Sequence, residues 1–423
     1  MPNPNKIHPR LANRMHIHAM SPTAHPLQVI VKYRAGAMAV ADTAEGVVAT
    51  THTFRLIQAS AHAMSMTGVN KLSERDDIEM IWLDEVVHTM LDASVPLIGV
   101  PAVWQAGFTG KGIKVAIVDT GIDPNHPDFT GRISQFKDFT GEGQKDNHGH
   151  GTHVAGIVGG TGAGSNGKYR GIAPECSFYI AKVLRGDGSG LNSDVMAGVE
   201  WAVQQGAQVI NLSLGSDGAC DGTDALSVLC DAAVSRGAVM CVAAGNAGPG
   251  ESTVGSPGCA KTVITIGATS KTDQIANFSS RGPTSDGRVK PDVCFPGVSI
   301  VSCRASGTAM GTPIDSLYTS ASGTSMATPH ATGSCALLLQ ANPGLTPQQI
   351  KDLFMNTAKD LGLPANTQGT GRAQVFAAYQ QAVNTPPTPT PPPPTPTPPP
   401  TPTPPPPGGD GCGAALKSIF GGR

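Results

Sequence analysis

Short apolar runs rich in β-branched residues alternate with stretches of helical periodicity from about residue 100 onward. The strand-like runs include "IKVAIVDTG", "SFYIAKVL", "AQVINLSLG", "AVMCVAAGN" and "TVITIGA", and the helical stretches include "SDVMAGVEWAVQQG" and "TDALSVLCDAAVSRG". Near-continuous apolar strands separated by helices are typical of a parallel sheet that is covered on both faces. The pattern therefore predicts an α/β fold with a mostly parallel sheet flanked by helices, in which sites form beyond the carboxyl ends of the strands.

The segment before this α/β unit has a different pattern. It opens with the strand-like "PLQVIVKYRAG", continues through helix-compatible sequence and closes with the strand-like "IEMIWLDEVV". Residues 26–91 are therefore predicted to form a small α+β domain. Residues 1–25 lack the apolar stretch of a signal peptide, and we expect them to be a disordered leader.

The C-terminal part of the chain divides at a tract of threonine and proline, residues 385–407. Such a tract cannot form helix or sheet ladders, so we expect an extended spacer, followed by a short tail at 408–423. The main domain is then 92–384. Near its end, Thr346, Pro347 and Gln349 predict a helix start with a capping box.

Charge and cysteine content narrow the functional classes. The 423 residues carry a net charge of -2 with both signs mixed, which excludes the basic footprint of a nucleic-acid-binding protein. No run approaches the ~18 apolar residues of a transmembrane helix.

The nine cysteines form no C-x-x-C pair. Cys220 and Cys230 flank a loop rich in aspartate and glycine and are the best candidates for a disulfide, with reduced buried thiols an equal alternative.

The stretch "GTSMATPH" places Ser325 at or near the start of a predicted helix. A serine there is ordinarily an N-cap, and the free N–H groups of a helix start also favour negative charge. A catalytic role would need a base within hydrogen-bond reach and an acid that orients this base.

Three other polar residues stand where predicted strands or loops end. Asp119 follows the strand "IKVAIVD", and His150 lies where the glycine-rich "DNHGHGTHVAG" turns into a helix. His150 and His153 would share a helix face, which makes metal ligation an alternative, but no third ligand stands at a recognisable spacing. Asn246 in "VAAGNAGPG" could donate its amide to a developing oxyanion, or it could simply occupy a turn.

Taken together, "VAIVDTGID", "HGHGTHVAG", "VAAGNAGP" and "GTSMATPHATG" resemble the signature blocks of the subtilisin-like serine proteases. The resemblance extends from about Pro26 to Asn384 and includes an N-terminal segment similar to the family's inhibitory propeptide. It implies that Asp119, His150 and Ser325 form the catalytic triad and that Asn246 is the oxyanion donor. It implies no cofactor for catalysis.

The resemblance also implies how substrate is held. Ser213, Leu214 and Gly215 of "NLSLGS" match the strand that pairs with the substrate backbone. Gly255 matches the floor of the primary specificity pocket, and a glycine there predicts a preference for large apolar residues before the cut bond. The structural alternative for Leu214 is a core residue.

Asp128 matches a calcium ligand of the family, but the companion loop "GTGAGSNGKYRG" is poor in oxygen-bearing side chains. A tight calcium site is therefore not expected. The same loop nearly matches a phosphate-binding loop, but Tyr169 replaces the hydroxyl residue and a helix precedes it instead of a strand, so nucleotide binding is rejected.

Our hypothesis is a monomeric, self-processing serine endopeptidase that acts on polypeptides, is inhibited by its own propeptide and works outside the cell or at its surface. Cleavage is expected after Met90 or Leu91. A catalytically silent homologue that serves as a binding module is the main alternative. An α/β-hydrolase esterase ranks last, because the order of the residues is Asp, His, Ser and no G-x-S-x-G motif is present.

Overall fold

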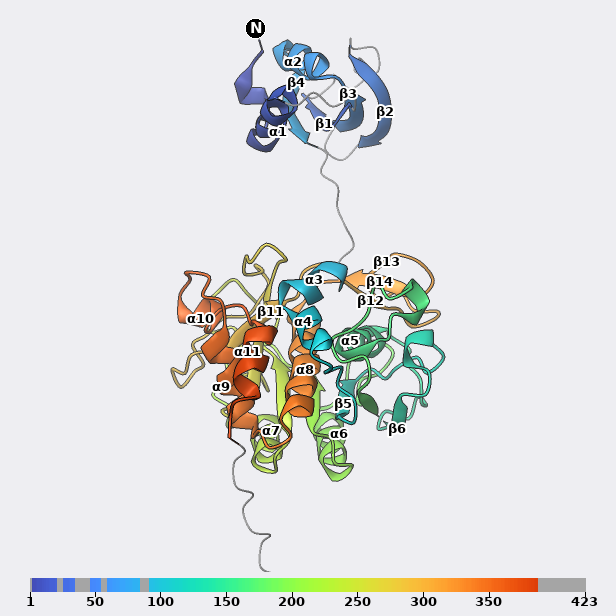
Figure 1. Ribbon diagram of the computed structural model, residues 1–423, viewed down its shortest axis with the longest axis vertical. Helices are drawn as coiled ribbons and strands as arrows, with labels where there is room; N and C mark the ends of the chain where they lie inside the picture. The colour runs from blue at the N-terminus through green and yellow to red at the C-terminus, as the bar shows by residue number, and fades with distance from the viewer. Residues whose placement is uncertain (1, 21–25, 35–45, 55–58, 84–90, 387–423) are drawn as a thin grey trace, which may run out of the picture.

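The computed structural model of the chain describes residues 2–20, 26–34, 46–54, 59–83 and 91–386. A small N-terminal domain and a larger α/β domain are visible in Figure 1, and each is described here by itself. Of the two residues after which cleavage is predicted, Met90 lies outside the described residues, whereas Leu91 is the first residue of the helix α3 (Leu91–Leu97). Residues 387–423, with most of the predicted spacer and the tail, also lie outside the described residues.

The N-terminal domain contains a four-stranded antiparallel sheet in the order β2-β3-β1-β4. Its elements are the strands β1 (Leu27–Tyr33), β2 (Val47–Phe54), β3 (Ala59–Met64) and β4 (Ile78–Leu83), the short η1 (Pro4–Lys6), and the helices α1 (Pro9–Met20) and α2 (Met66–Glu74). The predicted α+β character of this segment is confirmed.

The expectation of a disordered leader is wrong for the described part of it. Helix α1 buries Leu11 and Met15 in the same core as Val29 of β1 and Leu72 of α2. Sequence reasoning missed this helix because its apolar residues are few and polar residues stand between them. The N-terminal domain therefore begins well before residue 26.

The α/β domain is built on a seven-stranded sheet in the order β11-β10-β9-β8-β5-β7-β6, with every neighbouring pair parallel. Its strands are β5 (Lys114–Asp119), β6 (Ile133–Asp138), β7 (Ser177–Lys182), β8 (Val209–Leu212), β9 (Val239–Ala243), β10 (Ile264–Thr269) and β11 (Val293–Pro296). The predicted parallel sheet is confirmed.

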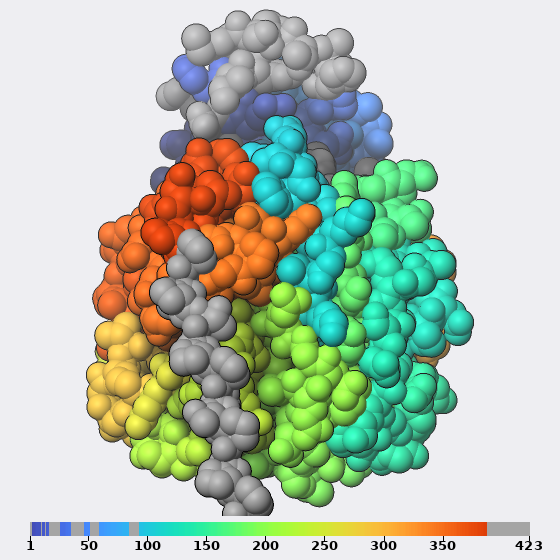
Figure 2. Space-filling model, turned by 60° about the horizontal axis from the view of Figure 1, so that its bottom comes forward, coloured from blue at the N-terminus to red at the C-terminus, as the bar shows by residue number. Residues whose placement is uncertain are grey.

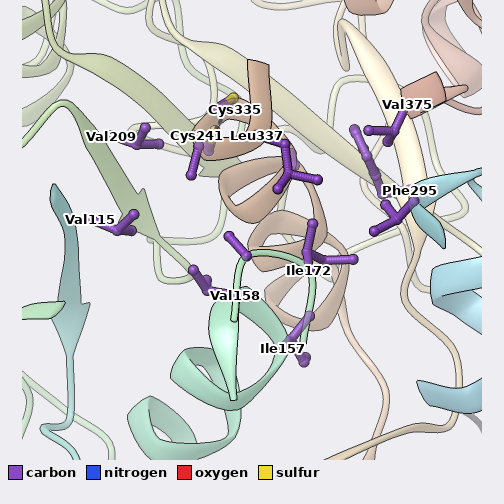
Figure 3. Packing of buried hydrophobic residues seen from close by; sticks show 14 of the residues in the cluster. Val115, Ile157, Val158, Ile172, Val209, Cys241, Phe295, Cys335, Leu337 and Val375 are labelled. Carbon is purple, nitrogen blue, oxygen red and sulfur yellow. Dashed lines mark hydrogen bonds between the residues drawn. The ribbon is translucent and has the colours of Figure 1, made fainter. Parts of the chain in front are cut away.

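Alternate residues of the strands β5, β7, β8 and β9 enter two separate cores. Val115 of β5 packs with the helices α5 and α8, whereas Val118 of the same strand packs with α6 and α7. Figure 3 shows the first of these cores, where Val115 and Val209 of the sheet lie near Leu337 and Cys335 of α8. The main helices are α5 (His150–Gly159), α6 (Asn192–Gln204), α7 (Ala225–Ser235) and α8 (Thr324–Ala341).

The remaining elements complete the surface of the domain. They are α3 (Leu91–Leu97), α4 (Val100–Gln105), η3 (Pro127–Phe129), η4 (Ala163–Ser165), the small antiparallel sheet of β12 (Ile300–Cys303), β13 (Thr312–Pro313) and β14 (Tyr318–Ala321), and α9 (Pro347–Thr357), α10 (Ala365–Gln368) and α11 (Val375–Ala382). In Figure 2 the cyan segment with α3 and α4 runs between the orange-red C-terminal helices and the teal segment. The capping box at the start of α9 is present as predicted.

None of the helices in the described part of the chain has both the length and the apolarity needed to cross a membrane.

Candidate active site

The carboxyl ends of three adjacent strands bring the predicted site residues together. In the order β9-β8-β5, Asp119 is the last residue of β5, Ser213 directly follows β8, and Asn246 lies just beyond β9. Because the strands are parallel, these ends share one edge of the sheet. The edge was predicted from sequence as the place of the site.

Asp119 and His150 form a close pair at this edge. Nδ1 of His150 donates to Oδ1 of Asp119 over 2.7 Å, and the backbone N–H of Thr120 donates to the same oxygen over 2.7 Å. The Asp119 carboxylate is fully buried. Burial lowers the pKa of His150, but the Asp119 charge and hydrogen bond, together with the Asp146 charge, outweigh it and raise the pKa above its ordinary value.

Backbone contact sets the spacing of this pair. A Cβ atom on Gly151, the residue after His150, would lie 2.1 Å from the carbonyl oxygen of Gly121, which is closer than real Cβ contacts. Gly149, before His150, has a φ of 103° in the left-handed region and forms the N-cap of α5. The glycines around His150 are therefore required for the approach of α5 to the Asp119 loop.

Ser325 is the second residue of α8, and its hydroxyl donates to the backbone carbonyl of Ser213 over 2.9 Å. The serine is thus near the end of β8, but its hydroxyl is turned to the backbone and not to the ring of His150.

The amide of Asn246 is held in one orientation. Its Oδ1 accepts from the backbone N–H of Thr324 over 2.9 Å and from the Thr324 hydroxyl over 3.0 Å. The Nδ2 group is therefore available as a donor. A Cβ atom on Gly323 would lie 3.6 Å from both Asn246 Nδ2 and the backbone nitrogen of Ser325, so these two N–H groups lie around the same small space.

Two cavities flank these groups. One of about 520 Å³ is lined by residues that include His148, His150, Gly188 and Leu214. The other, of about 380 Å³, is lined by residues that include Leu214, Gly215, Asp217, Asn246, Gly255 and Ser325. Leu214 is half-buried, lines both cavities and also packs against the second core, so both interpretations of this residue remain open.

Gly255 forms part of the second cavity by close backbone contact. A Cβ atom there would lie 1.8 Å from the carbonyl oxygen of Ser216, and the Ser216 N–H donates to the carbonyl of Ser256 over 2.8 Å. Any side chain at Gly255 would push the two walls apart. Gly255 was predicted from the resemblance to form the floor of the primary specificity pocket, and the structure shows it lining the cavity that Asn246 and Ser325 also line.

Residues 110–373 match the family model of the subtilases, Peptidase S8. The chain belongs to the subtilase family. It is 42% identical to Serine protease AprX of Bacillus subtilis (strain 168) over 311 residues, which cover 67% of this chain and 70% of that protein. It is 37% identical to Subtilisin E of the same organism over 334 residues, covering 77% of this chain and 82% of that protein.

A solved structure of a cold-adapted subtilisin-like serine proteinase is also similar, with 33% sequence identity and a TM-score of 0.52. The match covers 63% of this chain and 89% of that one. The predicted subtilisin-like fold is thereby confirmed, and this subtilase is a serine endopeptidase and a hydrolase.

The disulfide of this subtilase differs from the one predicted. Cys220 is bonded to Cys259, and the two Cα atoms are 5.9 Å apart. Cys230 is a free, fully buried thiol on the inner face of α7. The pairing of Cys220 with Cys230 was wrong because helical periodicity directs Cys230 into the core, whereas Cys259 follows the Gly255 loop, which packs on the segment after β8.

The surroundings of Asp128 do not fit a calcium ion. The buried carboxylate accepts from the backbone N–H groups of Gly162 and Gly164, both over 3.0 Å, and from the hydroxyl of Tyr318 over 3.0 and 3.1 Å. A calcium ion requires oxygen ligands, and here donors surround the carboxylate. The amides of the loop that resembles a phosphate-binding loop are thus directed at Asp128.

The metal alternative for His150 and His153 is not supported. Nε2 of His153 lies 3.1 Å from the carbonyls of Ile300 and Thr319, and burial is the main cause that lowers the pKa of His153 to about 3. His153 is therefore a neutral core residue that faces away from Asp119. Among the described residues, three grouped candidate metal ligands occur only at His126, Asp128 and Cys303.

Sequence reasoning missed two residues that shape the site, Thr324 and Asp146. Thr324 orients Asn246, and its position before Ser325 carried no separate signal. Asp146 stands four residues before His150, and an aspartate shortly before a helix start is a capping signal that could have drawn attention to it.

Proposed function

We propose that this serine endopeptidase cleaves peptide bonds with Asp119, His150 and Ser325 as its catalytic triad. The observation that carries the proposal is the 2.7 Å contact between a buried carboxylate and His150 at the sheet edge where Ser325 begins a helix. A histidine oriented in this way presents its other nitrogen, Nε2, as a base.

In the proposed reaction, Nε2 of His150 removes the hydroxyl proton of Ser325 while Oγ attacks the carbonyl carbon of the substrate. Asp119 accepts from Nδ1–H and stabilises the imidazolium cation that forms. His150 then gives the proton to the departing amine, which leaves an acyl group on Ser325. A water molecule, activated by the same histidine, hydrolyses this ester and regenerates the hydroxyl group.

The developing oxyanion would be stabilised by the Nδ2–H of Asn246 and the backbone N–H of Ser325. Both groups lie around the space beside Gly323. Because Thr324 fixes the amide before any substrate binds, its orientation costs little free energy during the reaction.

Substrate would bind as an added strand along Ser213, Leu214 and Gly215, with its side chains in the two cavities. The residue before the cut bond would enter the 380 Å³ cavity at Gly255. The proposed substrates are polypeptides, with a preference for large apolar residues at this position.

The chain would be made as a precursor. The N-terminal α+β domain would act as an inhibitory propeptide and be cut off after Met90 or Leu91. Export fits the disulfide between Cys220 and Cys259, because such bonds persist in oxidising compartments. We propose that the mature enzyme works as a monomer and needs no cofactor for catalysis.

The test is labelling of the purified protein with a serine-directed phosphonate, followed by peptide mapping. Wild type should be labelled at Ser325 and should cleave peptides, whereas Ser325→Ala should fold, remain unlabelled and be inactive. Peptidase activity in Ser325→Ala, or absence of labelling in folded wild type, would favour the alternative of a silent binding module.

A further inference from the structure

Asp146 is a buried carboxylate beside the catalytic pair, only 6% exposed. Its Oδ1 accepts from the Thr120 hydroxyl over 2.9 Å, from His148 N–H over 3.0 Å and from Gly149 N–H over 2.7 Å. Its Oδ2 accepts from the N–H and the hydroxyl of Thr152 over 2.9 and 2.7 Å. A carboxylate with this many donors stays ionised although it is buried.

These bonds join the two segments that carry Asp119 and His150. Thr120 directly follows Asp119, and its hydroxyl donates to Asp146 while accepting from the N–H of Gly151 over 2.9 Å. On its other side, Asp146 holds Gly149, the residue before His150. The Asp146 carboxylate is therefore hydrogen-bonded both to Thr120, the residue after Asp119, and to Gly149, the residue before His150.

A helix cap alone does not account for this arrangement. Capping of α5 would explain the bonds to Thr152 and to the backbone before the helix, but not the bond to Thr120 from another segment. Thr120 is also held from its other end, because the buried Lys182 donates to its carbonyl over 2.9 Å. The residue after Asp119 thus lies between a buried anion and a buried cation.

We propose that Asp146 is a positioning residue, which fixes the distance and orientation between Asp119 and His150 through Thr120 and the start of α5. The inference rests on the roles proposed above for Asp119 and His150. Asp146 touches neither the substrate cavities nor the reacting atoms, so it acts through the pair and should affect turnover more than substrate binding.

Asp146 also acts on His150 by its charge. The titratable groups that face His150 are Asp119, His148, His153 and Asp146, and of these the two carboxylates favour the protonated imidazole. Loss of the Asp146 charge should therefore lower the pKa of His150. On the acid limb of the pH–rate profile, activity falls as His150 becomes protonated. This limb should therefore move to lower pH.

The experiment compares Asp146→Asn with a matched control, Asp138→Asn. Asp138 also accepts from backbone N–H groups and a hydroxyl in a turn, those of Thr140 and Gly143, but it has no contact with the pair. Asp146→Asn should lower kcat about 10- to 100-fold with KM changed less than about twofold, and the control should behave like wild type.

A second measurement does not require activity. The imidazole of His150 is titrated by NMR in the Ser325→Ala background, with and without Asp146→Asn, and its pKa should fall only when the Asp146 charge is removed. An unchanged pKa together with an unchanged kcat would overturn the proposal. An unchanged pKa with a rate loss equal to the loss of folded protein would also overturn it, since Asp146 would then be purely structural.

A pair of variants covers the case in which Asp146→Asn does not fold. Thr120→Val removes the bond to Asp146 and should lower kcat, whereas Thr120→Ser keeps the hydroxyl and should restore it. Equal activity of the two variants would contradict the proposal. Failure of the proposed function would instead appear in wild type, as absence of phosphonate labelling at Ser325.

Discussion

Thr324 holds the amide of Asn246 with both its backbone N–H and its hydroxyl, at 2.9 and 3.0 Å. Both bonds go to the amide oxygen, so the NH₂ group is the part of Asn246 that is available to donate, as the proposed oxyanion role requires. The orientation exists without substrate. It therefore favours a role that is realised as charge develops and not when substrate binds.

Asn246→Ala should accordingly lower kcat with little change in KM. Loss of the corresponding donor in a subtilisin reduces kcat by about 10² to 10³, equivalent to about 2.7–4 kcal/mol, and we expect a similar effect here. Steady-state kinetics on a peptide substrate provide the measurement. Thr324→Ser, which keeps both donors to Asn246, is the control, and a raised KM at normal kcat would move Asn246 to a binding role.

The cavity at Gly255 should prefer Phe, Leu, Met or Tyr before the cut bond over Lys, Asp or Glu. Removing a large apolar side chain from water is favourable, whereas burying an unpaired charge is costly. Profiling with a peptide library measures the preference. Asp217, exposed at this cavity, makes lysine the informative residue. Dominant cleavage after lysine that disappears in Asp217→Asn would show that the apolar assignment is wrong.

The precursor should cut itself after Met90 or Leu91. Both are apolar residues of the kind that the inferred pocket accepts, and a cut within one chain benefits from a high effective concentration. Wild type and Ser325→Ala are purified in parallel and their N-termini are read by mass spectrometry. Only wild type should be processed, at a rate that does not depend on enzyme concentration.

Processing of Ser325→Ala at the same bond would mean that another protease trims a linker. A wild-type processing rate that rises with enzyme concentration would show cleavage between molecules. In either case self-cleavage within one chain is excluded.

Acid should destabilise the folded enzyme through His330. Its Nδ1 lies 2.8 Å from the Met326 carbonyl and its Nε2 lies 2.8 Å from the Ser94 hydroxyl, so the ring is bound in its neutral form. Burial is the main cause that lowers the pKa from its ordinary 6.5 to about 4. The unfolded chain therefore binds the proton first as the pH falls.

This contribution to stability is complete above about pH 6.5 and is lost as the pH falls toward 4, by up to roughly 3 kcal/mol. Urea unfolding of the inactive Ser325→Ala variant at several pH values measures it. Adding His330→Gln should lower stability at neutral pH and flatten its dependence over this range. An equally steep dependence in that double variant would assign the effect to other groups.

Removal of the Cys220–Cys259 disulfide should destabilise the protein by about 4 kcal/mol, because the bond closes a loop between residues 39 apart in sequence. The double variant Cys220→Ala, Cys259→Ala is compared with wild type by urea unfolding under oxidising conditions. Cys230→Ala is the control for cysteine loss without a disulfide. If a reductant destabilises the double variant as much as wild type, the pairing is wrong.

The sequence predicted the fold well, and it singled out four residues that the structure brings to one sheet edge, because their signals are local. Apolar strands, the capping box at Thr346 and the polar residues at strand ends can each be recognised within a few positions. The structure brings Asp119, His150, Asn246 and Ser325 to one sheet edge, although the hydroxyl of Ser325 is bonded to Ser213 and not to the histidine.

The features that were missed depend on contacts between distant segments. Tyr318 reaches Asp128 across 190 positions, which no local pattern reveals. The disulfide partner of Cys220 is decided by the packing of the Gly255 loop, and the structured leader by burial of Leu11. The role proposed for Asp146 depends on its hydrogen bond to Thr120, which belongs to another segment and is not visible in a local pattern.

The contact between Gly151 and the Gly121 carbonyl has a consequence for evolution and design. Because main-chain atoms limit how closely α5 approaches the Asp119 loop, and because Thr120 and Asp146 hold that approach, the side chains of Leu214 and His148 have no part in maintaining the spacing. Substitution of Leu214 or His148 should therefore leave the separation of Asp119 and His150 unchanged. The shape of the two cavities and the geometry of the Asp119–His150 pair can in this respect vary independently.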